Sequence, residues 1–318
     1  MASERPPKRV RESESPSIHA AEHHVTHWYR DGSIVLQVQD VLFRVHQTTL
    51  EKHSEVFRDL LSVPQMPDEQ QVEGCPFVHL EGDIAFDWTY LLDAIYDPLH
   101  LDALASQSLS DQLPRLSSIL RLSTKYRIAA FRKKCIALLS VHCQTGDTFV
   151  NPVNPTRIRH ASDLINLARE TNAKTLLPFA FLLLVSSESD ETIYHAPITE
   201  SDKLVAYRGM LRLLRARTND FLPFVPTFDP PANCQAGRAC SIGAKILKKL
   251  REHPSSALFF GPGDFSKYWP ACKVCQEYMR TTYESGRQRT WERLPEIFGL
   301  GKDWDELRRV EAYDYSDS

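Results

Sequence analysis

The sequence lacks any hydrophobic run long enough to cross a lipid bilayer. Its best candidate, LLPFAFLLLV at 176–185, contains a proline and falls well short of the roughly 20 residues that a spanning helix needs. The first residues, MASERPPKRVRESESP, have no apolar centre of the kind found in signal peptides. We therefore expect an intracellular protein, cytoplasmic or nuclear, that does not associate with membranes.

The chain also lacks an excess of charge of either sign. Its formal net charge is -3, with 25% charged and 42% hydrophobic residues, which predicts no general attraction to nucleic acid. Two basic stretches, RGMLRLLRAR at 208–217 and KILKKLR at 245–251, have no interleaved aromatic residues for stacking on bases. We expect solvated helix faces there and no direct contact with nucleic acid. Binding of an acidic protein partner to these stretches is the open alternative.

No motif of a known catalytic centre occurs. The sequence contains neither a Gly-x-Ser-x-Gly elbow nor a His-Glu-x-x-His helix, and nothing nominates a nucleophile with a base beside it. We therefore expect no catalytic residues and a protein that is not an enzyme.

The length of 318 residues predicts two compact parts. Residues 1–24 are rich in Pro, Ser, Glu and Arg and are predicted to be a disordered tail. Within this tail, PPKRVR is either a short nuclear localisation signal or a chance cluster of basic residues. Residues 25–142 are predicted to be an α+β domain. Residues 143–157, with two Asn-Pro dipeptides, are predicted to be a linker, and residues 158–310 an all-helical domain.

The hydrophobic period changes within the first domain. Apolar residues alternate from Ile34 to Val45 around a bend at Gln39-Asp40, which predicts a hairpin. A single helix is predicted to start just after His46, where Thr48 and Glu51 have the form of a capping box, and to stop before Pro64. Another strand at 76–80, a helix capped by Asp83 and two amphipathic helices before residue 142 complete the domain, and no clear period is seen across 97–113.

His46 lies where the predicted hairpin turns into a helix. Because no nucleophile or carboxylate is placed beside it by a motif, we interpret it as a joint whose imidazole bonds neighbouring backbone. Asp31 is expected to accept bonds from the turn amides of Gly32 and Ser33. The histidines at 19, 23, 24 and 27 lie at the edge of the predicted tail, and we expect a solvated segment there rather than a metal site.

Residues 31–57 resemble the BTB (POZ) domain. The matching positions are Asp31, Gly32, Ile34, Leu36, Val38, Phe43, Val45, His46, Leu50, Ser54 and Phe57, and later landmarks follow in the family's order over about 115 residues. Asp40 and Gln47 depart from the family's usual residues. The helical second half, with NLARETNAKTLLPFAFLLL and RTWERLPEIFGL, resembles the C-terminal region of fungal, basidiomycete-type BTB proteins.

The resemblance implies a BTB/POZ fold and protein association as the function. Such domains pair with themselves or with other BTB proteins, and many bring a target protein to a cullin-type ubiquitin ligase as adaptors. Met66 and Asp68 fit the cullin-contact loop of that subset. The alternative is a transcription- or chromatin-associated protein that the BTB domain dimerises, and the identity of the target is open in both cases.

Seven cysteines, an odd number, fit reduced thiols better than a set of disulfides. Cys234 and Cys240 form one pair and Cys272 and Cys275 a second. Two cysteine pairs separated in the sequence are the general pattern of a four-cysteine zinc site. The first pair is spaced more widely than usual. Three interpretations stay open: small buried side chains in a core, a structural zinc site and a redox pair.

Overall fold

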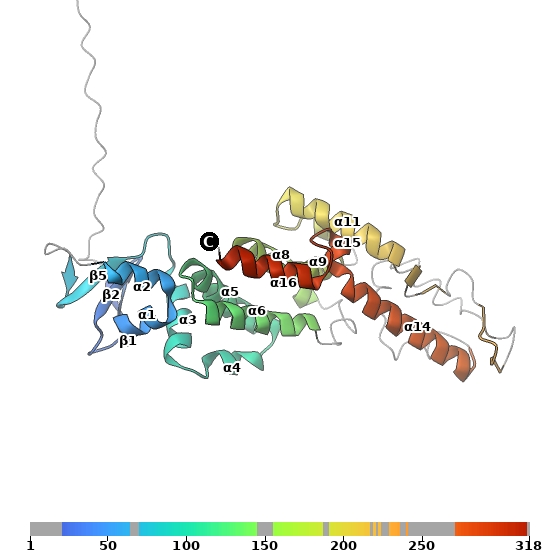
Figure 1. Ribbon diagram of the computed structural model, residues 1–318, viewed down its shortest axis with the longest axis horizontal. Coiled ribbons are helices and arrows are strands. Elements are labelled where there is room, and N and C mark those ends of the chain that lie inside the picture. The colour runs from blue at the N-terminus through green and yellow to red at the C-terminus, as the bar shows by residue number, and fades with distance from the viewer. Residues whose placement is uncertain are drawn as a thin grey trace, which may run out of the picture. The chain divides into compact units, whose positions relative to one another are not determined.

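The structure is a computed structural model of the chain (Figure 1). It describes residues 21–63, 70–144, 155–186, 191–216, 219–220, 222–223, 229–235, 240 and 271–316. Contacts between Cα atoms divide the chain into two compact units, residues 1–93 and 94–318. The first contains every described strand and the regular elements described in the second are helices, so the chain has an α+β fold.

Unit 1 is built on a mixed five-stranded sheet of order β1-β3-β2-β5-β4. The strands are β1 (Glu22–Trp28), β2 (Ile34–Val38), β3 (Val41–Val45), β4 (Gln71–Val72) and β5 (Cys75–His79). The predicted hairpin is confirmed, because β2 and β3 pair in antiparallel fashion with Ile34 opposite Val45 and Val38 opposite Val41. Gln39 takes the left-handed conformation, φ 53°, that such a tight turn requires.

Strand β2 is buried along its whole length and forms the centre of this sheet. All five of its residues are buried, including the polar Gln37, because β3 lies on one side of it and β5, in parallel register, on the other. Alternate residues of a strand face opposite sides of the sheet, so both faces of the sheet are covered here.

The helical segment after the hairpin differs from the prediction in two ways. It consists of two helices, α1 (Gln47–His53) and α2 (Glu55–Ser62), with Ser54 in extended conformation between them. The Ser54 hydroxyl accepts a bond from the Phe57 amide and so caps α2. The predicted helix start just after His46 is confirmed, because α1 begins at Gln47, whose amide bonds the Ser33 hydroxyl. The predicted capping box is wrong, because Thr48 lies inside α1.

The helix predicted after Asp83 is confirmed as α3 (Ala85–Tyr96). Its first amide bonds the side-chain oxygen of Gln39, and the Asp83 carboxylate accepts a bond from the Trp88 ring nitrogen at 2.8 Å. The indole of Trp88 is fully buried and meets the Phe57 ring edge-on, with centroids 5.9 Å apart.

The disordered tail predicted over residues 1–24 ends earlier than expected. Strand β1 begins at Glu22 and pairs in parallel with β3, so residues 22–24 belong to the sheet. The histidine-rich sequence of β1 conceals the alternation of apolar residues by which a strand is recognised. The rest of the predicted tail, up to residue 20, lies outside the described residues.

Unit 2 is a helical assembly around α9 (Leu177–Val185), the apolar run noted in the sequence. All nine residues of α9 are buried, and it contacts α8 (Pro155–Glu170), η2 (Lys174–Leu176), α10 (Glu191–Tyr194), α11 (Glu200–Ala216) and α15 (Leu294–Phe298). The other helices are α4 (His100–Ala105), α5 (Leu109–Lys125), α6 (Ala129–Gln144), α14 (Lys273–Glu292) and α16 (Trp304–Ser316). No described helix combines the length and hydropathy of a membrane-spanning segment.

The predicted domain limits at residues 142 and 158 differ from the division into units. Helices α5 and α6 were grouped with the strands, yet they belong to unit 2, where α5 packs against α8. The segment 97–113, which has no clear period, contains α4 and the start of α5. The basic stretch at 245–251, predicted to be a solvated helix face, lies outside the described residues.

Gly209 allows α11 and α15 to approach closely. A Cβ atom at this position would lie 2.1 Å from Cδ1 of Phe298. That ring is almost completely buried and stacks with Phe181 of α9 at 5.5 Å, so it cannot move aside without cost.

We therefore expect Gly209→Ala to destabilise the protein by about 1–3 kcal/mol through overpacking, although alanine is otherwise the better helix former. Ser201→Ala, at an exposed position of the same helix, is the control and should change the free energy of unfolding by less than about 0.5 kcal/mol. Urea denaturation monitored by circular dichroism measures both. Equal stability of the two variants would contradict the close approach.

Candidate metal centre

Four cysteines from two distant parts of the sequence meet in unit 2. Cys234 and Cys240 follow the proline-rich stretch, whereas Cys272 is the N-cap of α14 and Cys275 lies in its first turn. Their sulfur atoms all lie within 4.8 Å of one another. Cys240 and Cys275 are buried and the other two are half-buried. Among the described residues this is the only group of three or more potential metal ligands.

The separations between the sulfur atoms exclude disulfide bonds and are compatible with a metal site of four thiolates. Cys234 Sγ lies 3.6 Å from Cys240 Sγ, 3.9 Å from Cys272 Sγ and 3.4 Å from Cys275 Sγ, whereas bonded sulfurs are about 2.05 Å apart. Four thiolates around one zinc ion, with Zn–S distances of about 2.3 Å, stand about 3.8 Å from each other. The cluster therefore has the size of a Cys₄ metal site.

Backbone amides donate hydrogen bonds to these sulfurs. The Cys272 amide donates to Cys240 Sγ at 3.2 Å. The amide of Cys275, followed by that of Gln235, lowers the pKa of Cys272 to about 6, because a hydrogen bond to sulfur and a helix N-terminus both favour the thiolate. Burial among the other thiols raises the pKa of Cys275. Since the thiolate is the form that binds metal, the cluster carries donors that support ligation.

The other two interpretations of these cysteines fit the geometry less well. A thioredoxin-like pair requires a strand that leads into the helix, and the described strands all lie between residues 22 and 79. Cysteines that serve only as small buried side chains in a core would not be expected to bring four sulfur atoms within 4.8 Å of one another. The convergence of the sulfurs is therefore the feature that favours a metal site.

His46 joins the hairpin to α1, as expected, and its side chain contacts the Asp31 carboxylate. Its Nε2 lies 3.3 Å from Oδ1 of Asp31. The turn amides assigned to Asp31 bond elsewhere, that of Gly32 to the Tyr29 carbonyl and that of Ser33 to the Val45 carbonyl. The Asp31 backbone amide, followed by His46, lowers the pKa of the Asp31 carboxyl.

The other residues of the predicted BTB motif lie in or beside the core of unit 1. Phe43, Leu50, Ser54 and Phe57 are buried. Gly32 lies where a Cβ atom would come within 2.7 Å of Arg44 Cγ and 3.0 Å of the Tyr29 carbonyl, so only glycine fits there. Met66 and Asp68, the predicted cullin-contact residues, lie outside the described residues.

Two histidines expected in a solvated segment instead tie β1 to α3. His27 is buried, with Nε2 3.0 Å from Oδ1 of Asp93, and His24 Nε2 lies 3.1 Å from the Thr89 hydroxyl. Burial lowers the pKa of both histidines. Their partners are far away in sequence, so no local pattern could have revealed these contacts.

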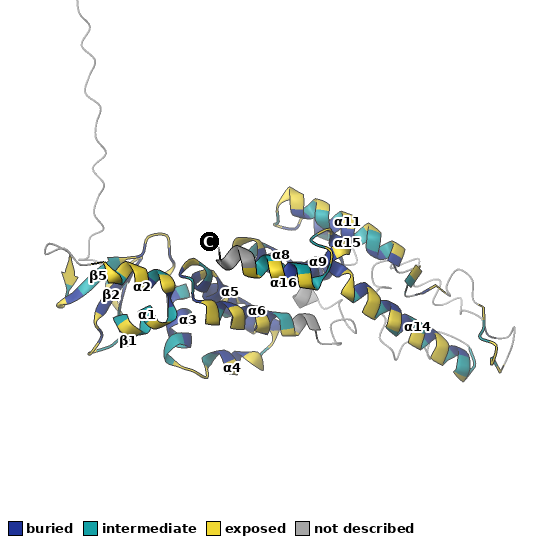
Figure 2. Ribbon diagram, in the orientation of Figure 1, coloured by how far each residue is buried: buried dark blue, intermediate teal, exposed yellow. Residues whose placement is uncertain are grey.

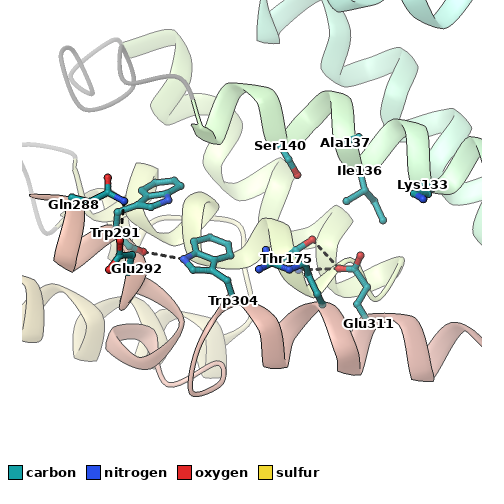
Figure 3. Close-up of a pocket in the computed structure, with 11 residues that line it drawn as sticks. Lys133, Ile136, Ala137, Ser140, Thr175, Gln288, Trp291, Glu292, Trp304 and Glu311 are labelled. Atoms are coloured by element: carbon teal, nitrogen blue, oxygen red, sulfur yellow. Dashed lines mark hydrogen bonds between the residues drawn. The ribbon is translucent and has the colours of Figure 1, made fainter.

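Unit 2 also contains an open cleft of about 530 Å³ that sequence reasoning missed (Figure 3). Trp291 and Trp304 stack at 5.5 Å, and the Trp304 ring nitrogen donates to the Trp291 carbonyl. The Glu311 carboxylate accepts bonds from the amide and the hydroxyl of Thr175. Among the described lining residues there is no histidine or cysteine.

No family model, curated protein or solved structure matches this chain. The geometry of the site and the resemblance noted in the sequence therefore carry the functional argument.

Proposed function

We propose that the chain is a non-enzymatic protein-interaction module. Its first unit acts as a BTB-like domain that self-associates, and the whole chain serves as an adaptor for a cullin-type ubiquitin ligase. Support comes from the order of elements in unit 1, a hairpin, a helical segment, a strand parallel to β2 and then α3, which follows the order of the landmarks in the resemblance, although the helical segment is divided into α1 and α2.

The observation that carries the proposal is a set of exposed apolar side chains on two linked elements of unit 1. Val25 of β1 is 97% exposed, and Ile84 and Phe86 at the start of α3 are more than half exposed. The bonds from His24 to Thr89 and from His27 to Asp93 hold β1 against α3. Exposed apolar groups on adjoining elements are typical of association surfaces, and β1 is also an edge strand. We assign this surface to a second copy of the chain.

Replacing apolar side chains of this surface by carboxylates should separate the copies. We expect the full chain to be a dimer by light scattering and the double variant Ile84→Asp, Phe86→Asp to be a monomer, because the charges would have to be desolvated at the interface. Leu60→Asp on α2, also exposed, is the control and should remain dimeric. A wild-type monomer, or a dimer that survives the double substitution, would reject the self-association surface.

The adaptor role has a separate test. The full chain is expected to capture the N-terminal domain of a cullin in a pull-down, and Met66→Ala with Asp68→Ala should abolish capture by removing the apolar and acidic contacts. Gln65→Ala, in the same stretch, is the matched control. Absence of capture by a correctly folded wild-type chain would remove the adaptor role and leave self-association untouched.

For the four cysteines we propose a structural Zn²⁺ ion. Zinc would be held by Cys234, Cys240, Cys272 and Cys275, and its role would be to fasten the segment after the proline-rich stretch to the start of α14. Four thiolates leave no open position for substrate, as in structural rather than catalytic zinc sites. The distances between the sulfurs and the amide donors around them support this proposal.

Metal analysis of the purified full chain should find about one zinc per chain. The variant Cys272→Ser, Cys275→Ser should lose the metal and melt at a lower temperature, because the binding energy contributes to folding. Cys75→Ser is the matched control, since Cys75 is buried in unit 1 with its thiol bonded to the Gly32 carbonyl. Zinc content that is zero in the wild type, or the same in both, would refute the site.

A further inference from the structure

Helix α11 has apolar residues on two opposite faces. Ala206, Gly209 and Leu213 are buried on one face, where the helix packs against α9 and α15. At about 100° per residue, Leu204 and Leu211 lie on the opposite side. Their side chains are 70% and 58% exposed, and Figure 2 shows exposed residues along this helix. The core of unit 2 does not explain this second apolar face.

The spacing on the exposed face follows the heptad of a coiled-coil seam. Leu204 and Leu211 are seven residues apart, and Tyr207 and Leu214, both half-buried, follow each of them by three residues, as d positions follow a positions. This set of four residues is the α11 stripe. It is long enough to receive about two heptads of a second helix.

Positive charge lines one side of the stripe. Arg208 and Arg215 are exposed and occupy the e positions of the same heptad, where charges select the partner of a coiled coil. On the other side, the g positions hold Met210 and Lys203, and the Lys203 ammonium is ion-paired with the Glu200 carboxylate at 2.8 Å. The flank with the two arginines is therefore the basic one.

We infer that the α11 stripe docks an amphipathic α-helix of a partner protein, with leucine-type residues at its a and d positions and Asp or Glu at its flanks. This partner helix would belong to the target protein that the proposed interaction module recruits, and the inference therefore rests on that proposed function. Apolar burial at the seam supplies affinity, and the two arginines select acidic over basic helices.

Charge disfavours a second copy of the same stripe as the occupant. In a parallel pair Arg208 would face Lys203 of the other copy and Arg215 would face Met210, and in an antiparallel pair arginine would face arginine. The Glu200 carboxylate is already paired with Lys203, and like charges directly opposed are unfavourable. The stripe is therefore suited to a heterotypic acidic helix.

Two synthetic peptides of about three heptads test the inference on the full chain by fluorescence anisotropy. Both have leucine at a and d, one has glutamate at e and g, and its twin has lysine there. We expect the glutamate peptide to bind at least about tenfold more tightly than its twin. The variant Arg208→Glu, Arg215→Glu should reverse this preference, with folding verified by circular dichroism.

The apolar part of the inference has its own variants. Leu204→Ser with Leu211→Ser should reduce binding of the glutamate peptide by at least about tenfold, whereas Leu99→Ser, at a 69% exposed leucine elsewhere in unit 2, should leave it unchanged. Equal binding of the twin peptides, no binding of either, or self-association that disappears in the Leu204, Leu211 variant would overturn the inference. Because none of these variants touches unit 1, the outcome is independent of the dimer and cullin tests.

Discussion

Each unit of this protein depends on one short element that is buried on every side. In unit 1 this is β2, which has neighbouring strands along both edges and side chains packed on both faces. In unit 2 it is α9, whose nine residues are all removed from water. Burial of apolar surface at about 25 cal/mol per Å² stabilises the arrangement, and the surrounding helices and strands take the positions that cover these two elements.

Features governed by local periodicity could be predicted from the sequence. The hairpin was predicted because alternation and a two-residue turn both act over a few residues, and α3 because its apolar residues recur at helical spacing. The break at Ser54 was missed, since the residues on both sides of it continue one helical period. Strand β1 was missed because its buried residue is the polar His27, whose partner Asp93 is far away in the sequence.

The ligands of the candidate metal centre could be predicted from the sequence, but their convergence could not. The close spacing of Cys272 and Cys275 marks one pair of ligands, and Cys234 and Cys240 were nominated in spite of their wider spacing. The meeting of the four sulfur atoms could not be deduced, because it depends on where the tertiary fold places Cys272 relative to Cys234 and Cys240, which are far away in the sequence. The amide donors are likewise a property of the folded backbone, as is the second apolar face of α11, whose exposure depends on how the helix packs.

Cys240 and Cys272 meet although 31 residues separate them in the sequence. The entropy lost when two positions of a chain are brought together grows only with the logarithm of the number of residues between them. Doubling that number would cost only about 0.6 kcal/mol more. The distance in sequence between the two cysteine pairs is therefore only a small thermodynamic obstacle to the convergence of their sulfur atoms.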